Sequence, residues 1–188
     1  MAKLVSNVYG DALFELAIES NRLDEFFEET KGIKEIVIQN PELSQMMNHP
    51  KINKEEKLQA VENIFKGKAS DEMVGLLRMI IEKDHFEDII DILDYFIARV
   101  YEQKNIGVCL VTTPMELTEQ QKSDVEKRLL ETTKYDSFMM EYKVDTGLIG
   151  GMVIRIGDRV VDSSIKSKIY DLSKELQKIQ LKVGECAQ

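Results

Sequence analysis

The chain has 188 residues, of which 43% are hydrophobic, and it carries a formal net charge of −9. A chain of this length can bury a sizeable core without metals or disulfides. The acidic balance argues against nucleic acid or an anionic membrane surface as a direct partner, because both require a basic protein surface.

The cysteines and the distribution of apolar residues bear on where the protein works. Cys109 falls in an apolar, strand-like run and Cys186 in a polar tail, and two cysteines make no disulfide framework, so a reducing compartment is the simpler interpretation. No stretch reaches the roughly 20 apolar residues of a membrane span, and the first residues lack the character of a signal or transit peptide. We therefore expect a cytoplasmic protein that meets a membrane only through partners.

Residues 3 to about 104 show helical spacing throughout. The first helix has an apolar stripe at spacings of three and four, formed by Val5, Val8, Tyr9, Ala12, Leu13, Leu16 and Ala17. Turn and cap signals then divide the region, at Asn40-Pro41, Pro50, Asn53, Gly67 and Ser70. The last stripe runs from Phe86 to Tyr101. We expect six consecutive helices with short connections, which form a bundle.

The pattern changes near Asn105 to short alternating segments. The expected elements are strands at 106–113, 138–144, 152–156 and 159–161 and helices at 118–133 and 164–181. In the last helix we expect Ile165, Ile169 and Leu172 to pack on the sheet. The predicted class is α+β, with a six-helix bundle over residues 1–105, a small mixed domain with a short β-sheet and two helices over 106–181, and a flexible tail over 182–188.

The segment from Val144 to Ser164 is the most informative in the chain. Gly150-Gly151 marks a bend or a close backbone approach, and Gly157-Asp158 is a two-residue turn signal between two short apolar runs. Ser163 or Ser164 can then cap the following helix, because a side-chain oxygen there satisfies a free backbone N–H. The segment is therefore predicted to be a β-hairpin that leads into a helix.

Residues that carry chemistry are scarce. His49 and His85 lie far apart in the sequence and lack neighbours at metal-ligand spacing, so we interpret both as structural. The glycines at 147, 150 and 151 precede a strand, whereas phosphate-binding loops open onto a helix N-terminus. We therefore expect no catalytic residue, no cofactor and no metal site.

Several motifs resemble the delta subunit of bacterial F-type ATP synthases, whose mitochondrial counterpart is the oligomycin-sensitivity-conferring protein. They include Tyr9-Gly-Asp-Ala-Leu-Phe-Glu-Leu-Ala17, Asn40-Pro41, Pro50, Lys57 and Thr113-Pro114 with Leu117-Thr118. The more specific part is the C-terminal hallmark, carried by Leu148, Gly150, Gly151, Gly157, Asp158, Asp162 and Ser164. The sequence departs from the family pattern at Gly10, His85 and Ser163, which puts in doubt a specific ion pair at position 85.

The resemblance implies a non-catalytic stator subunit, present in one copy per complex on the cytoplasmic face of the plasma membrane. Its N-terminal bundle would grip the N-terminal helices of alpha subunits, and its C-terminal domain would join peripheral-stalk subunit b, so that rotor torque drives ATP synthesis. By the same resemblance, the candidate residues for the alpha-subunit helix are Tyr9, Ala12, Leu13, Leu76, Leu77 and Ile80. The alternative for these six residues is that they belong simply to the core.

Two other functions remain open from the residues alone. A stand-alone helical adaptor or regulator that binds amphipathic helices would explain the bundle but not the hallmark, and an enzyme would need the glycine-rich segment to hold a nucleotide. A further hypothesis concerns Gly10, which costs roughly 1 kcal/mol inside a helix. We expect it to permit a partner's backbone to approach closely, so that Gly10→Ala would strengthen the helix and weaken partner binding.

Overall fold

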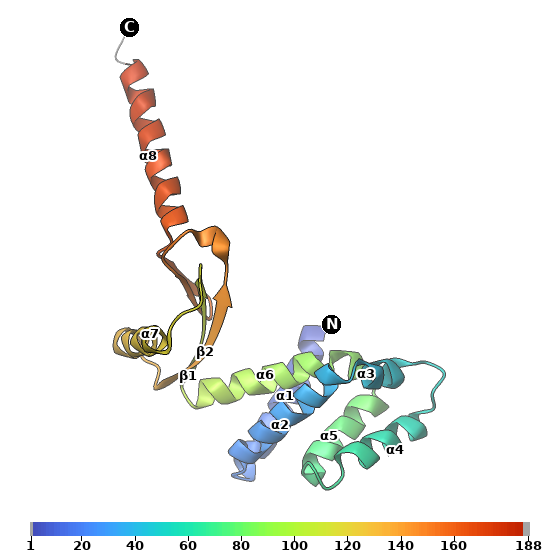
Figure 1. Cartoon of the computed structure of the whole chain (residues 1–188). Helices are drawn as coiled ribbons and strands as arrows, with labels where there is room; N and C mark the ends of the chain where they lie inside the picture. The colour runs from blue at the N-terminus through green and yellow to red at the C-terminus, as the bar shows by residue number, and fades with distance from the viewer. Residues whose placement is uncertain (1, 186–188) are drawn as a thin grey trace. The chain divides into compact units, whose positions relative to one another are not determined.

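The computed structural model describes residues 2–185, with side-chain environments for residues 4–176. It contains eight α-helices and a four-stranded sheet in this described part, which confirms the α+β class. The chain divides into two compact units, Met1–Gln103 and Lys104–Gln188, and each is described by itself (Figure 1).

The first unit is helical. Its elements, in chain order, are α1 (Ala2–Glu19), α2 (Leu23–Gln39), α3 (Pro41–Asn48), α4 (Lys54–Phe65), α5 (Asp71–Glu82), the short 3-10 helix η1 (Phe86–Asp88) and α6 (Ile89–Gln103). The helix expected from Phe86 therefore opens with a 3-10 turn. One hydrophobic core joins these helices, and its fully buried side chains include Phe26, Met73, Leu77, Ile80 and Phe96.

Polar contacts tie α2 to the other helices of this unit. The Glu29 carboxylate of α2 accepts hydrogen bonds from Ser70 N at 2.9 Å and from Ser70 Oγ at 2.7 Å. The negative charge thus lies at the positive N-terminal end of α5, where it is favourable. Neither Asn53 nor Ser70 caps its own helix with its side chain, although both occupy N-cap positions. The prediction that these two residues cap their helices is therefore wrong. At the start of α5, the Glu29 carboxylate of α2 accepts the hydrogen bonds instead.

Gly10 lies at a close contact between α1 and α6. A Cβ atom there would meet Tyr95 Cδ1 at 2.4 Å, so the tyrosine ring packs directly on the glycine backbone. The Tyr95 hydroxyl donates to the Asp11 carboxylate at 3.1 Å, and Arg99 Nε lies 3.2 Å from the same carboxylate. The close approach expected at Gly10 is real, but it is made by the chain's own α6, and the hypothesis of a partner's backbone is wrong.

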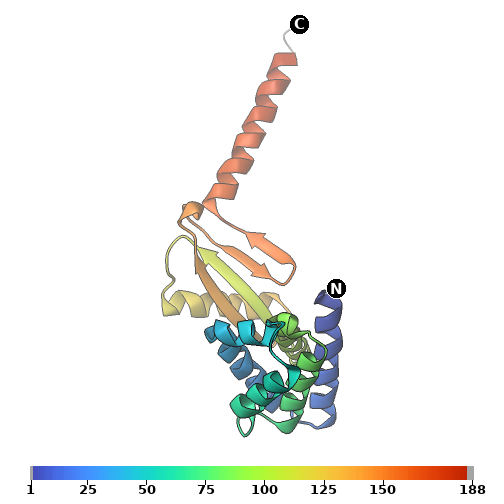
Figure 2. The same ribbon diagram turned by 90° about the vertical axis from the view of Figure 1, so that its right-hand side faces the viewer.

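The second unit is built on a mixed sheet with strand order β2-β1-β3-β4. Its elements are β1 (Ile106–Thr113), α7 (Glu119–Thr132), β2 (Ser137–Val144), the 3-10 helix η2 (Thr146–Leu148), β3 (Val153–Ile156), β4 (Arg159–Asp162) and α8 (Ile165–Glu185). β1 pairs with β2 in parallel from Ile106↔Ser137 to Thr113↔Val144, and the other two pairings are antiparallel (Figure 2). Thr118 begins α7 with a capping box that Gln121 completes.

Among the residues that the structure describes, a helix covers one face of this sheet, and that helix is α7. Cys109, Val111 and Phe138 point to the side of α7 and form a small core with Leu129. The alternate residues of the same strands lie on the other face, where Val108 and Met139 are exposed. Because side chains alternate along a strand, this exposure leaves an apolar row open on the uncovered face.

The last helix, α8, does not cover that open face. Its residues Ile165, Ile169 and Leu172 are exposed at 43%, 55% and 59%, so the expectation that they pack on the sheet is wrong. The helix instead leaves the end of β4 and runs on to Glu185, beyond the end expected at Leu181 (Figures 1 and 2). The rest of the expected tail, residues 186–188 with Cys186, lies outside the described residues.

The close packing of Tyr95 on Gly10 predicts how a methyl group added at position 10 changes the stability of the protein. Gly10→Ala should lower the free energy of unfolding by about 1–3 kcal/mol, because the overpacking against Tyr95 outweighs the gain of about 1 kcal/mol in helix propensity. Urea unfolding followed by circular dichroism measures the change.

Gly32→Ala is the matched control. Gly32 also lies inside a helix, α2, but a Cβ atom there meets nothing within 4 Å. It should therefore raise the free energy of unfolding, by up to about 1 kcal/mol. Equal stabilisation by the two substitutions would show that Tyr95 does not restrict position 10.

Candidate partner-binding surfaces

The structure divides the six residues expected to contact an alpha-subunit helix. Leu13, Leu77 and Ile80 are at most 2% exposed and belong to the core of the first unit, and Leu76 is also buried. Tyr9 is half-buried with its ring 6.0 Å from that of His85, and Ala12 is exposed. Of the six, Tyr9 and Ala12 are therefore the residues that a partner can reach without opening the core.

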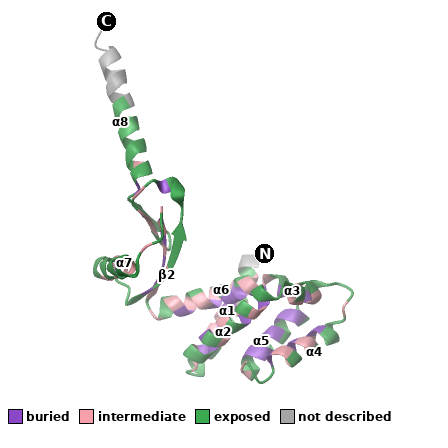
Figure 3. Ribbon diagram, viewed as in Figure 1, coloured by how far each residue is buried: buried purple, intermediate pink, exposed green. Residues whose placement is uncertain are grey.

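α1 has a second apolar side that faces away from the core. Leu4, Val8 and Leu16 are exposed at 70%, 60% and 38%, and with the exposed Ala12 they recur at every fourth residue. Figure 3 colours the exposed residues of the helices green and the buried ones purple. The sequence analysis placed Val8 and Leu16 in one apolar stripe with Leu13 and Ala17, but they lie on a different side of the helix from these two buried residues. We refer to Leu4, Val8, Ala12 and Leu16 as the outer face of α1. The sequence indicates this outer face because the helix has more apolar residues than a single buried stripe requires.

A cluster of three polar side chains, formed by Asp11, Tyr95 and Arg99, lies beside the outer face of α1. Asp11 lies between the Tyr95 hydroxyl and the Arg99 guanidinium, and the Arg99 guanidinium also lies over the ring of Phe14 at 5.1 Å. Partial burial, together with the neighbouring Asp11 carboxylate, raises the pKa of the Tyr95 hydroxyl above its ordinary value. The phenol therefore stays a hydrogen-bond donor at neutral pH and fixes α1 against α6.

The hallmark glycines lie where the chain doubles back between η2 and α8. Gly151 has a φ of +79°, and a Cβ atom there would lie 2.5 Å from the backbone oxygen of Ser163. A Cβ atom on Gly150 would meet Ile165 at 2.6 Å, and Ile165 N donates to Gly150 O at 2.9 Å. The close backbone approach predicted for this pair is confirmed, and it joins the loop before β3 to the first residue of α8.

Ile149, next to these glycines, has an unusual conformation. Its φ is +65°, which is strained for a β-branched residue, and its side chain is 69% exposed. The preceding Leu148, by contrast, is buried. An isoleucine that is both strained and exposed contributes little to this fold, so Ile149 is a candidate contact residue that the sequence analysis missed.

Asp162 and Ser164 organise the start of α8. Asp162 accepts hydrogen bonds from Ser167 Oγ at 2.5 Å and from Ser164 N at 2.8 Å, and Ser164 Oγ accepts one from Ser167 N at 3.2 Å. Ser164 is therefore the cap that was expected at Ser163 or Ser164. The hydrogen bonds from Ser167 and Ser164 lower the pKa of the Asp162 carboxyl below its ordinary value. Gly157-Asp158 forms the predicted two-residue turn, since Ile156 pairs with Arg159.

The second unit also contains a cavity of about 1070 Å³ between α7 and the β3–β4 hairpin. Its apolar lining includes Leu117, Val125, Leu129, Ile154, Ile156 and Val161. All of these residues except Val161 also belong to the small core of this unit or pack against it. The uncovered sheet face and α8 are the apolar areas outside that core.

Chemistry that could support catalysis is not assembled in the described residues. They contain no group of three or more His, Cys, Asp or Glu side chains that could hold a metal ion. Burial raises the pKa of the Cys109 thiol to about 11, so it is a poor nucleophile at neutral pH. His49 Nδ1 accepts a hydrogen bond from Lys51 N in a turn, and His85 packs on Tyr9. None of the helices described here is both long and apolar enough to span a membrane.

Two small cores with apolar helix faces left exposed are typical of a protein that holds other polypeptides. Comparison with known proteins gives the particular family. The family model for the ATP synthase delta (OSCP) subunit matches residues 5–176, and the chain therefore belongs to this family. It is a structural, non-catalytic component of the peripheral stalk of the F-type ATP synthase.

Relatives cover nearly the whole chain. The ATP synthase subunit delta of Lachnoclostridium phytofermentans is 56% identical over 181 residues, which are 96% of this chain and 100% of the relative. That of Halalkalibacterium halodurans is 34% identical over 172 residues, which are 92% and 94% of the two chains. A chain of the Toxoplasma gondii mitochondrial ATP synthase hexamer, solved by cryo-EM, has the same fold, with a TM-score of 0.74 at 17% identity over 92% of this chain and 97% of that one.

The hydrogen bonds of Asp162 predict a pH dependence at the start of α8. The pKa of the Asp162 carboxyl is lower in the folded chain than in the unfolded chain. The stabilisation that ionised Asp162 gives to the start of α8 is therefore fully present above the ordinary aspartate pKa, and it is lost as the pH falls through the lowered folded value. The carboxyl ¹³C shift of Asp162 follows its titration. Amide hydrogen exchange over residues 165–168 follows the loss of stability at the start of α8. Ser167→Ala should move the pKa back toward its ordinary value. An unchanged Asp162 titration in that variant would contradict the hydrogen-bond explanation.

Proposed function

We propose that this subunit links the catalytic head of the synthase to its peripheral stalk by binding a helix with each unit. The first unit binds the N-terminal helix of an alpha subunit, and the second unit binds subunit b of the stalk. The link works on the cytoplasmic face of the plasma membrane and keeps the head from turning with the rotor, so that torque is used for ATP synthesis.

The outer face of α1 is the single observation that best supports the first half of this proposal. Leu4, Val8, Ala12 and Leu16 form an apolar stripe on the side of the helix opposite its buried residues Leu13 and Ala17. An exposed stripe at helical spacing suits a second amphipathic helix, which can bury its own apolar side there. We therefore place the alpha-subunit helix along α1, with Tyr9 and Ala12 retained from the six expected residues. The other four of the six residues lie in the core of this unit.

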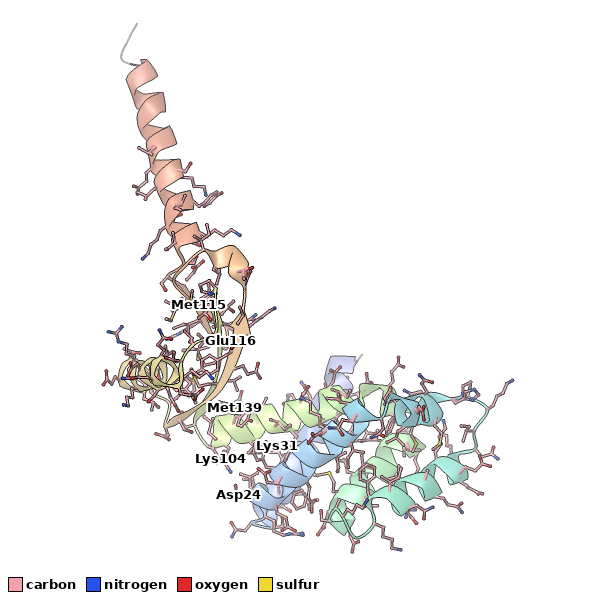
Figure 4. All side chains as sticks on the ribbon, in the orientation of Figure 1. Asp24, Lys31, Lys104, Met115, Glu116 and Met139 are labelled. Carbon is pink, nitrogen blue, oxygen red and sulfur yellow. The ribbon has the colours of Figure 1, made fainter. Side chains whose placement is uncertain are left out.

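The second half rests on the apolar surface of the second unit. Ile149 and Met115 are exposed in the segments that follow β2 and β1, and the side chains of α8 are exposed as well. Figure 4 labels Met115. Exposed apolar residues that gather in this way mark sites of protein association. A strained isoleucine among them agrees with a surface that is kept for contact, because the fold itself gains nothing from it.

Peptide binding to the full-length chain tests the first half. A labelled synthetic peptide of the alpha-subunit N-terminal helix should bind saturably in fluorescence anisotropy. Val8→Ser should weaken this binding roughly tenfold, because a buried valine contributes about 1.5 kcal/mol. Val8 is exposed in the free chain, so the thermal unfolding of the variant should match that of the wild type.

Ile38→Ser is the matched control for this experiment. Ile38 lies on α2 and is 56% exposed, close to the 60% of Val8, but it is not part of the outer face of α1. Its substitution should leave peptide binding unchanged. Absence of binding to the folded wild type, or equal losses in the two variants, would refute the proposed surface.

A further inference from the structure

β2 forms an unprotected edge of the sheet in the second unit. The strand order β2-β1-β3-β4 leaves one side of β2 without a neighbouring strand in the described part of the chain. The eight residues of β2 pair with β1 without a bulge, and they include no proline or glycine. Natural proteins usually shorten or interrupt such an edge, because its free backbone N–H and C=O groups can pair with another strand. The opposite edge follows this rule, since β4 has only four residues.

The side chains of β2 are largely exposed as well. Met139, Tyr142 and Val144 are 45%, 38% and 47% exposed. The register with β1 places Met139, Glu141 and Lys143 on the uncovered face of the sheet, and Tyr142 and Val144 on the side of α7. A strand that pairs with β2 would therefore cover apolar side chains and satisfy free backbone groups at the same time.

α7 leaves this edge of the sheet accessible. Its buried Leu129 packs with Cys109 of β1 and with Phe138 near the start of β2. Tyr142, farther along β2 on the same side, remains exposed, although the Lys122 ammonium lies 5.2 Å from the centre of its ring. Another strand can therefore approach β2 from the side away from β1.

Two charges of opposite sign lie on the uncovered face of β2. Glu141 and Lys143 are exposed, and neither has an ion-pair partner among the residues that the structure describes. In an antiparallel pair of strands, opposite charges that lie directly across from each other are stabilising, and like charges are destabilising. A strand that fits β2 therefore presents a positive residue to Glu141 and a negative residue to Lys143.

A second copy of β2 meets both requirements. A two-fold axis perpendicular to the sheet makes the two β2 strands antiparallel and keeps each face of the sheet on its own side. If the axis passes through Tyr142, Glu141 of each copy lies opposite Lys143 of the other, and Met140 lies opposite Val144. Tyr142 then lies opposite Tyr142. The pairing thus contains two ion pairs and one aromatic pair.

Other registers of the same pair are less favourable. An axis through Glu141 or through Lys143 places like charges opposite each other, and an axis through Met140 forms no ion pair. An axis through Val144 brings only that residue of each strand opposite the other strand. A shift by half a step places residues of different faces opposite each other. The two charges therefore select one register.

We propose that two copies of the free chain pair along β2 in the register that is centred on Tyr142, so that their two sheets become one continuous sheet. This inference does not rest on the proposed function, because it concerns the chain before any partner protein binds. The pairing joins residues 140–144 of the two copies and satisfies backbone groups that a single chain leaves open. Since the contact is short, the dimer is reversible.

Charge exchange tests the register on the full-length chain. Sedimentation equilibrium over a series of concentrations should show a reversible monomer–dimer equilibrium for the wild type. Glu141→Lys should lower the association constant at least about tenfold, because the new lysine faces Lys143 at two places. Lys143→Glu should have the same effect. The two substitutions together restore both ion pairs with reversed polarity, and the association constant should return to within about threefold of the wild type.

Glu131→Lys is the matched control, because it makes the same change of charge on the side of α7 that faces the β3–β4 hairpin. It should leave the association constant within about twofold of the wild type. The thermal unfolding of all these variants should match that of the wild type, since the substituted residues are exposed. A double variant that stays as weak as the single ones, or equal losses at Glu141 and Glu131, would refute the register.

A disulfide across the two-fold axis tests the same register independently. Residues directly opposite each other in an antiparallel pair have Cα atoms about 4.5–5.5 Å apart, which a disulfide can bridge. In a Cys186→Ser background, Tyr142→Cys should therefore link two copies under mild oxidation, as seen on a non-reducing gel. Cys109 is buried and adds no accessible thiol.

Val144→Cys in the same background is the control for the disulfide. The two new thiols would lie about four residues apart along the paired strands, or about 13 Å, which is too far for a disulfide. Cross-linking that is equal at the two positions, or absent at position 142, would contradict the proposed register.

Two further outcomes also overturn the proposal. A dimer that Val8→Ser removes and charge exchange leaves unchanged would assign the contact to the outer face of α1. A wild type that remains monomeric at every concentration but binds the alpha-subunit peptide would rule out the β2 pairing and leave the proposed function standing.

Discussion

The contact of Gly151 with the backbone of Ser163 is the constraint on which the second unit depends. It brings the loop before β3 against the residues that open α8, at a distance that any side chain at position 151 would prevent. The hydrogen bond from Ile165 N to Gly150 O and the capping bonds of Asp162 then fix the first turn of the helix. These contacts together set the direction of the first turn of α8.

Both units share one physical arrangement. Each closes one hydrophobic core and leaves further apolar surface on a helix at its edge, which is α1 in the first unit and α8 in the second. Both helices are fixed by polar groups at defined points, through Tyr95 and Asp11 on α1 and through Asp162 on α8. A rigid helix that already presents its apolar side loses little conformational entropy when a partner binds.

The sequence was sufficient to predict most elements but not the use of each helix face. Periodicity predicted the helices, the four strands and the hairpin at Gly157-Asp158, because turn chemistry and side-chain alternation are local properties. It misplaced Ile165, Ile169 and Leu172, which it assigned to packing on the sheet. An apolar stripe shows that a helix face will be buried, but not whether the chain or another protein buries it. Gly10 was misread for the related reason that its neighbour Tyr95 is distant in sequence.

The strand order has a mechanical consequence. β1 enters the sheet at Ile106, and β4 leaves it at Asp162, and the two strands run in the same direction because each is antiparallel to β3. A pull between the start of β1 and α8 therefore acts along the strands from opposite ends of the sheet. Since the backbone hydrogen bonds of antiparallel pairs are perpendicular to the strands, such a pull shears many of them at once instead of unzipping them one by one. The sheet is thus oriented to resist tension along the chain.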